Sequence, residues 1–179
     1  WLHVLATRAD GTVVFESGRE TGDGRIEGNN ADDDPSDWEP HYDTIISAHQ
    51  VQIYEPVMRN TDGEVTHTLL RAYEYVKDNR LLPAGFDKTS ADPDFAVHGV
   101  PPDENNFQGG SDRIVYEIDI SEVSGALDVM VEVLFQSVSY PFVADLENTE
   151  TDLVQTFLGM YDPAANTAVA LARFQQRVD

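Results

Sequence analysis

The sequence predicts a mainly β protein: an antiparallel β-sandwich of jelly-roll or Greek-key type with one short helix near the C-terminus. Apolar and polar residues alternate in several segments, as they do in strands that bury one face. Asp10-Gly11 and Asp62-Gly63 each lie between two such segments, and Asp-Gly is typical of a hairpin turn. We therefore expect about seven strands and one helix in a single domain that covers residues 1–179.

The N-terminal part is expected to contain one hairpin and one long loop. Residues 2–17 form the hairpin, with Val13 and Phe15 on one face of its return strand. Residues 18–43 are rich in glycine and aspartate and too long for an ordinary connection. Such a segment is either a functional loop or disordered.

A second hairpin is expected at the centre of the sheet, within residues 50–88. Val51, Ile53 and Val57 lie on one face of its first strand. The second strand, over residues 65–77, also fits a helical stripe, but its aromatic residues and the turn residues that follow favour a strand. The next segment, residues 85–110, is irregular, with a short strand expected at 95–97.

Residues 113–120 and 127–136 alternate regularly and predict two antiparallel strands, the second of them in the middle of a sheet. Thr149 is the expected N-cap of the helix, whose apolar stripe consists of Leu153, Val154, Phe157, Leu158 and Tyr161. Residues 167–178 are expected to close the sheet as a strand, and a terminal helix is the alternative.

Composition excludes several classes of protein. The chain has 33 acidic and 11 basic residues, a net charge of −22, which disfavours nucleic acid and anionic membranes as partners. An acidic, lysine-poor surface suits high salt, so a salt-loving source is one interpretation and an acidic secreted domain is the other. There is no cysteine, which excludes disulfides, thiolate metal sites and covalently attached haem within these residues. No apolar run is long enough for membrane insertion.

The chain begins at Trp1, without methionine, inside an expected strand. We therefore expect a fragment of a longer polypeptide or a chain whose leader has been removed.

The candidate metal ligands lie in the first long loop. Its carboxylates are oxygen ligands of the kind that calcium prefers, and without the spacing of an EF-hand the alternative is a solvated acidic loop. The candidate residues are Asp32, Asp33, Asp34, Asp37 and Asp43.

Few residues point to catalysis. Glu55 shares a face with apolar residues, so it either points inward and needs a partner such as Arg71 or Arg80, or lies where the strand leaves the core. A structural ion pair is the first interpretation, and a catalytic carboxylate is the second. The five histidines have no metal-ligand spacing, and there is neither a nucleophile elbow nor a phosphate-binding loop.

Four blocks of sequence resemble a known family. They are WLHVLATRADGTVVFESG at 1–18, EPHYDTI at 39–45, QVQIYEPVM at 50–58 and LLRAYEYVKDNRLLPAGFDK at 69–88. These blocks are similar to the non-haem β-domain found toward the C-terminus of bacterial multihaem c-type cytochromes. The chain departs from the complete family pattern because it contains no haem-binding motif.

The resemblance implies a non-catalytic accessory domain of an exported cytochrome, in the periplasm or outside the cell. Haem c is then expected on an upstream part of the chain, and the partner is the haem-bearing domain or a redox partner protein. A free-standing surface or carbohydrate-binding module is the alternative, with stacking surface from Trp38, Tyr42, Tyr54, Tyr73 and Tyr75. A third hypothesis is that the chain is an enzyme, and Glu55 is the only residue that supports it.

Overall fold

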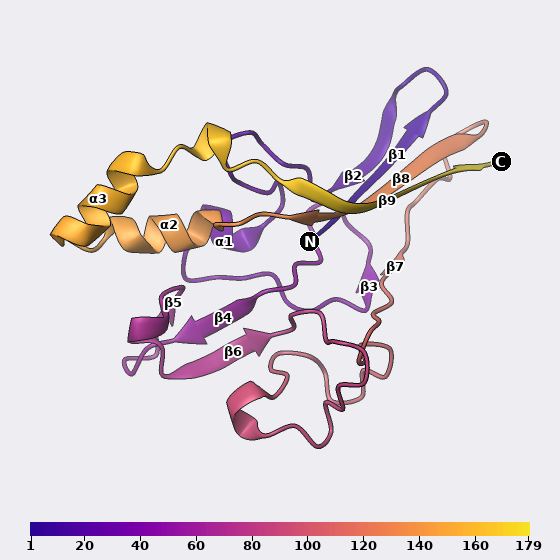
Figure 1. Cartoon of the computed structure of the whole chain (residues 1–179). Coiled ribbons are helices and arrows are strands. Elements are labelled where there is room, and N and C mark those ends of the chain that lie inside the picture. The colour runs from indigo at the N-terminus through magenta and orange to yellow at the C-terminus, as the bar shows by residue number, and fades with distance from the viewer.

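A computed structural model describes all of residues 1–179, and its largest element is a four-stranded antiparallel sheet (Figure 1). Its strands are β1 (Leu2–Arg8), β2 (Val13–Ser17), β8 (Leu127–Phe135) and β9 (Val169–Val178), in the order β2-β1-β8-β9. The predicted N-terminal hairpin, the central position of β8 and the closing strand are confirmed. The alternative of a terminal helix is wrong.

The two faces of this sheet differ in polarity, as strict alternation requires. Val4 and Ala6 of β1 and Phe15 of β2 lie in the core together with Ile45. On the opposite face, His3 lies between the carboxylates of Glu16 and Glu132, at 3.1 and 3.2 Å.

A smaller antiparallel sheet contains β4 (Pro56–Arg59), β5 (Val65–Thr66) and β6 (Glu74–Asp78), in the order β5-β4-β6. The predicted hairpin turn is confirmed: the Asn60 side chain accepts hydrogen bonds from the backbone N–H groups of Asp62 and Glu64. The strands are shorter than expected. The second predicted strand is interrupted by the 3-10 helix η1 (Leu69–Arg71), and residues 51–55 lie outside the ladder although Val51 and Ile53 are buried.

Residues 113–120 were expected to form a strand antiparallel to residues 127–136, and this pairing is wrong. Only β7 (Val115–Tyr116) is a strand, and it pairs in parallel with β3 (Thr44–Ile45). Both edges of β8 are already taken by β1 and β9. Ile114, Tyr116 and Ile118 instead pack on the apolar face of the large sheet.

Three α-helices form where one was expected: α1 (Asn30–Asp33), α2 (Tyr140–Glu147) and α3 (Asp152–Met160). The predicted helix is α3, but its N-cap is Thr151, whose hydroxyl accepts a hydrogen bond from the Val154 N–H. The expected N-cap Thr149 lies two residues too early.

Two further 3-10 turns, η2 (Pro93–Phe95) and η3 (Pro163–Ala165), complete the elements. The strand expected at 95–97 is absent because η2 occupies its start, and only His98 bridges to Asp78 of β6.

The fold is mainly β with antiparallel sheets, but the sheets are not closed into one barrel or complete sandwich (Figure 1). In Figure 1 the large sheet projects to one side, α2 and α3 lie at its other end, and the sheet of β4, β5 and β6 lies across from them. Only 29 of the 179 residues are buried, and nine of these form two separate apolar clusters. None of the helices has both the length and the apolar character needed to cross a membrane.

Candidate functional site

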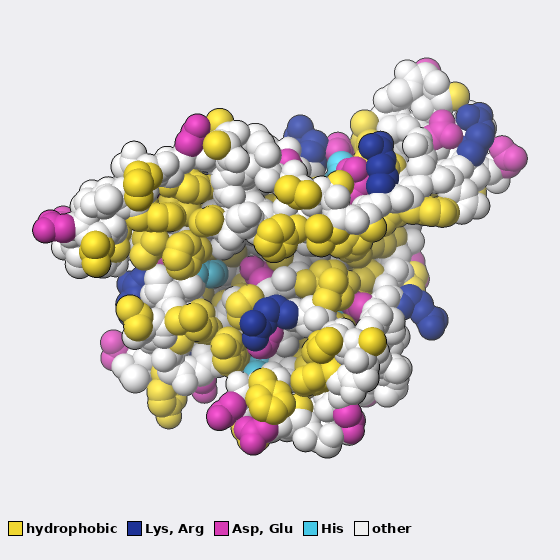
Figure 2. Space-filling view, in the orientation of Figure 1, with side chains coloured by type: hydrophobic (Ala, Val, Ile, Leu, Met, Phe, Trp, Pro, Cys, Tyr) yellow, Lys and Arg dark blue, Asp and Glu magenta, His cyan; other side chains and the backbone are white.

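A groove of about 880 Å³ lies between the two antiparallel sheets. One wall comes from the small sheet and η1, with Met58, Leu70 and Tyr75, and the other comes from the end of β8 and α2, with Phe135 and Phe142. Figure 2 shows hydrophobic side chains on both sides of the hollow. We refer to it as the apolar groove, since 14 of its 26 lining residues are hydrophobic.

Large apolar side chains on the walls of the groove are exposed. Leu69, Leu70 and Phe135 are among them, and Leu70 is fully exposed. Isolated hydrophobic residues are common on protein surfaces, but a contiguous patch rimmed by polar residues marks a binding surface. The walls therefore have the character of an interface rather than of a solvated face.

A buried carboxyl group lies at the floor of the groove. Asp32 sits in α1, whose N-cap Asn29 accepts a hydrogen bond from the Ala31 N–H. The Asp32 Oδ2 atom accepts a hydrogen bond of 2.7 Å from the Ile26 N–H, whereas its buried Oδ1 atom has no partner. Burial raises the pKa of Asp32 to about 6, and the nearby Glu55 carboxylate adds to this shift.

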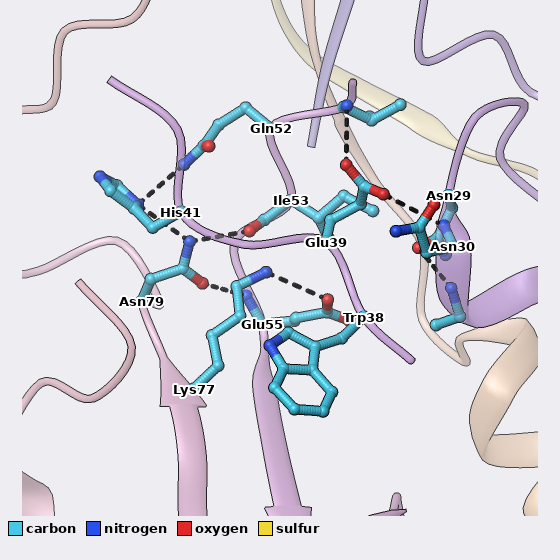
Figure 3. A network of polar contacts seen from close by, with 12 residues as sticks. Asn29, Asn30, Trp38, Glu39, His41, Gln52, Ile53, Glu55, Lys77 and Asn79 are labelled. Atoms are coloured by element: carbon cyan, nitrogen blue, oxygen red, sulfur yellow. Dashed lines mark hydrogen bonds and ion pairs between the residues drawn. The ribbon is translucent and has the colours of Figure 1, made fainter. Parts of the chain in front are cut away.

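Glu55 also lines the groove, and it forms an ion pair with Lys77 of β6 (Figure 3). The Lys77 Nζ atom lies 3.2 Å from the Glu55 Oε1 atom, and the Lys77 side chain is completely buried. Burial lowers the pKa of Lys77, which Glu55 opposes. The expected structural ion pair is confirmed, but its expected partners are wrong: Arg71 pairs with Asp145 and Arg80 with Asp78, both at 2.6 Å.

A network of polar side chains holds residues 51–55 behind the groove (Figure 3). Glu39 is fully buried and accepts hydrogen bonds from the Asn30 and Val51 N–H groups. Asn79 accepts from the Glu55 N–H and donates to the Ile53 carbonyl oxygen. Side chains thus replace the ladder of a strand, which explains why this apolar segment is ordered without belonging to a sheet.

His41 belongs to the same network. Its Nδ1 atom lies 3.0 Å from Gln52 Nε2 and 3.1 Å from Asn79 Nδ2, and both amide groups donate to it. Burial lowers the pKa of His41, so the ring is kept neutral. Nothing in the sequence pattern signals this role, because Glu39 and His41 lie in the segment 18–43, which is expected to be either a functional loop or disordered.

A second histidine, His67, lines the groove itself, and its buried Nε2 atom has no partner. Burial lowers its pKa as well. The groove therefore combines apolar walls with two unpaired polar atoms, on Asp32 and His67, that are buried beneath its surface.

The five candidate calcium ligands are dispersed. Asp32 faces the groove floor, Asp34 accepts from Ser36, Asp37 accepts from the Trp38 N–H, Asp43 accepts from the Asn106 amide, and Asp33 is exposed. No group of three or more histidine, cysteine, aspartate or glutamate residues is placed to hold a metal ion. Calcium binding stays a prediction to which this geometry adds nothing.

The aromatic residues expected to bind carbohydrate do not form one platform. The hydroxyl groups of Tyr42 and Tyr54 donate inward, to Glu39 and Asp112. Tyr75 stacks on His98, and Tyr73 is exposed. Carbohydrate binding likewise remains untested.

The sequence matches no protein-family model, no curated protein and no solved structure.

Proposed function

We propose that this chain is a non-catalytic accessory β domain of an exported multihaem c-type cytochrome, and that its apolar groove receives the haem-bearing domain. A redox partner protein is the alternative occupant. The observation that carries the proposal is the groove itself: a wide hollow between two open sheets, with exposed leucine and phenylalanine side chains on its walls. The blocks of sequence similar to such cytochromes support the choice of partner.

Physical chemistry favours a protein as the occupant. Covering apolar surface is worth about 25 cal/mol per Å², so leucine and phenylalanine side chains on opposed walls give a partner a large driving force. A net charge of −22 disfavours nucleic acid and anionic membranes and favours a partner with a basic rim. A periplasmic or extracellular location is part of the same proposal.

The finer architecture belongs to this proposal too. β4 and β6 supply one side of the groove and β8 the other, so an element inserted between them would complete two layers. We suggest that the complete domain is a β-sandwich of jelly-roll or Greek-key type in which the partner fills this space.

A non-catalytic role fits the polar groups of the groove. Glu55, the one residue that favoured an enzyme, is neutralised by Lys77 and anchors a buried segment. Its carboxylate is held in a structural pair, which is the more common use of such a group.

The first test is the coding sequence upstream of Trp1. We expect one or more Cys-x-x-Cys-His motifs there, and their absence would overturn the cytochrome assignment.

The second test is binding. The haem-bearing region, produced separately, should bind this domain, and Leu70→Asp should weaken binding at least tenfold, whereas Val13→Asp on the distant strand β2 should not. Equal affinity for the two variants would show that the groove is not the docking surface.

A further inference from the structure

The edge of the large sheet at β9 is unusual in its length and exposure. All ten residues of β9 are exposed, and β9 pairs with β8 alone (Figure 1). Unpaired edges are normally shortened, bulged, charged or covered, because their N–H and C=O groups can pair with another chain. The opposite edge strand, β2, has only five residues and an irregular register. β9 is regular over residues 172–178 and contains no proline.

The register shows which backbone groups of β9 point outward. Trp1 and Leu134 exchange two backbone hydrogen bonds of 2.9 Å each, so the N–H and C=O of Leu134 point toward β1. Alternation along β8 then directs Val131 toward β9, where it lies opposite Phe174. The backbone N–H and C=O groups of Phe174 are therefore directed at β8, whereas those of Arg173, Gln175 and Arg177 point away from the sheet.

The side chains of this edge are also suited to pairing. Phe174 and Val178 extend the apolar face of the sheet and are 61% and 50% exposed. On the other face, Arg173 lies 3.7 Å from Glu132 and Arg177 lies 3.5 Å from Asp128, so both arginines already have partners within the sheet. No carboxylate lies on β9 itself.

We propose that β9 pairs antiparallel with β9 of a second copy of this chain, about a two-fold axis at Phe174. In this register the two Phe174 side chains meet in a non-hydrogen-bonded pair, where Cα atoms are closest, at about 4.5 Å. Arg173 then lies opposite Gln175, and Arg177 opposite Leu171. An axis at 173 or at 175 would instead place arginine opposite arginine, which destabilises the pair. Of the registers about residues 173, 174 and 175, only the one about Phe174 keeps the arginines apart, and its product is a continuous eight-stranded sheet.

The effect of salt on binding distinguishes a second copy of this chain from other partners of β9. Two copies of net charge −22 repel each other, so salt should strengthen the dimer by screening. A basic strand from another protein would be attracted by the acidic chain, and salt would weaken its binding. β9 contributes no residue to the apolar groove, so this inference does not depend on the proposed function.

The test is sedimentation equilibrium of the whole chain over a range of protein and sodium chloride concentrations. We expect a monomer–dimer equilibrium that shifts toward dimer as salt rises. Gln175→Pro removes an outward N–H and should give a monomer with an intact fold, because proline is tolerated at such an edge position. Gln175→Thr is the matched control and should remain a dimer.

Two further variants check the assignment. Phe174→Glu places two carboxylates opposite each other at the axis and should also give a monomer, even if the proline variant folds poorly. Gln176→Pro removes an N–H directed at β8 and should lower the melting temperature, in contrast to Gln175→Pro. A parent protein that stays monomeric at all concentrations and salts, or a dimer that survives both Gln175→Pro and Phe174→Glu, would overturn the proposal.

Discussion

The ammonium group of Lys77 lies 3.2 Å from the carboxylate of Glu55, although the lysine side chain has no exposed surface. A buried cation of this kind is tolerated only with a counter-charge, because removing it from water costs several kcal/mol. The pair connects β6 to the segment 51–55 and so joins the small sheet to the groove floor.

Glu55→Gln should therefore lower the free energy of unfolding by about 3 kcal/mol, since it leaves the Lys77 charge unpaired. Urea unfolding measures this change. Glu122→Gln, on an exposed turn, is the control and should lie within about 0.5 kcal/mol of the parent. The double variant Glu55→Gln/Lys77→Met should recover part of the loss; if it is no more stable than Glu55→Gln alone, the buried charge is not the cause.

The sequence predicted correctly the strands that pair with a neighbour in the chain and the strands in which apolar and polar residues alternate regularly. Asp10-Gly11 predicts the β1–β2 hairpin. The central position of β8 follows because one face of this strand is apolar and the other face is half apolar. Ser139 and Pro141 carried a helix-start signal that could have located α2, because proline is favoured in the first turn.

The remaining features depend on contacts that are distant in the sequence. The parallel pairing of Ile45 with Tyr116 leaves no local pattern, because parallel strands are joined by long connections. The partner of Glu55 was predicted wrongly because it depends on the pairing of β6 with β4, which brings Lys77 to the segment 51–55. The network of Glu39 and His41 was missed because polar residues in a glycine-rich segment usually remain solvated.

Asp32→Asn should stabilise the protein at pH 7. The folded-state pKa of about 6 lies above the ordinary value of 3.8, so ionising Asp32 at neutral pH costs folding free energy. A difference of about two pKa units corresponds to about 2 to 3 kcal/mol. The stability due to this group is fully present below pH 3.8 and is lost as pH rises through 6. The melting temperatures of the parent and the variant should differ at pH 7 and become similar at pH 4. The same difference at both pH values would contradict the raised pKa of Asp32.

His41 should make the protein less stable in mild acid. Its folded-state pKa is lowered from 6.5, so the unfolded chain binds the proton more readily. Its stability contribution is complete above pH 6.5 and falls below it, with a slope of up to about 1.4 kcal/mol per pH unit. Urea unfolding between pH 7 and pH 5 measures the slope. The His41→Gln variant should be less stable, and its free energy of unfolding should depend less on pH. The exposed His49→Gln variant should show the same pH dependence as the parent. Equal slopes in all three proteins would exclude His41 as the source.

Added monovalent salt should raise the melting temperature. With a net charge of −22 the folded surface repels itself, and molar salt screens that repulsion within about 3 Å. The measurement is a series of melts in sodium chloride from low to molar concentration. A melting temperature that does not change would show that the acidic surface carries no net repulsion.

Calcium and magnesium should have equal effects at matched ionic strength. A calcium site formed by Asp32, Asp34 and Asp37 would have to bring together carboxylates that already accept hydrogen bonds from the backbone N–H groups of Ile26, Ser36 and Trp38. Breaking those bonds costs free energy that binding would have to exceed, and Asp34→Asn retains the acceptor for Ser36. Melts in millimolar calcium, in magnesium and in sodium controls should therefore coincide for parent and variant. A specific site occupied at 100 times its Kd would add about 2.7 kcal/mol of stability, so an excess shift with calcium that Asp34→Asn abolishes would establish the site.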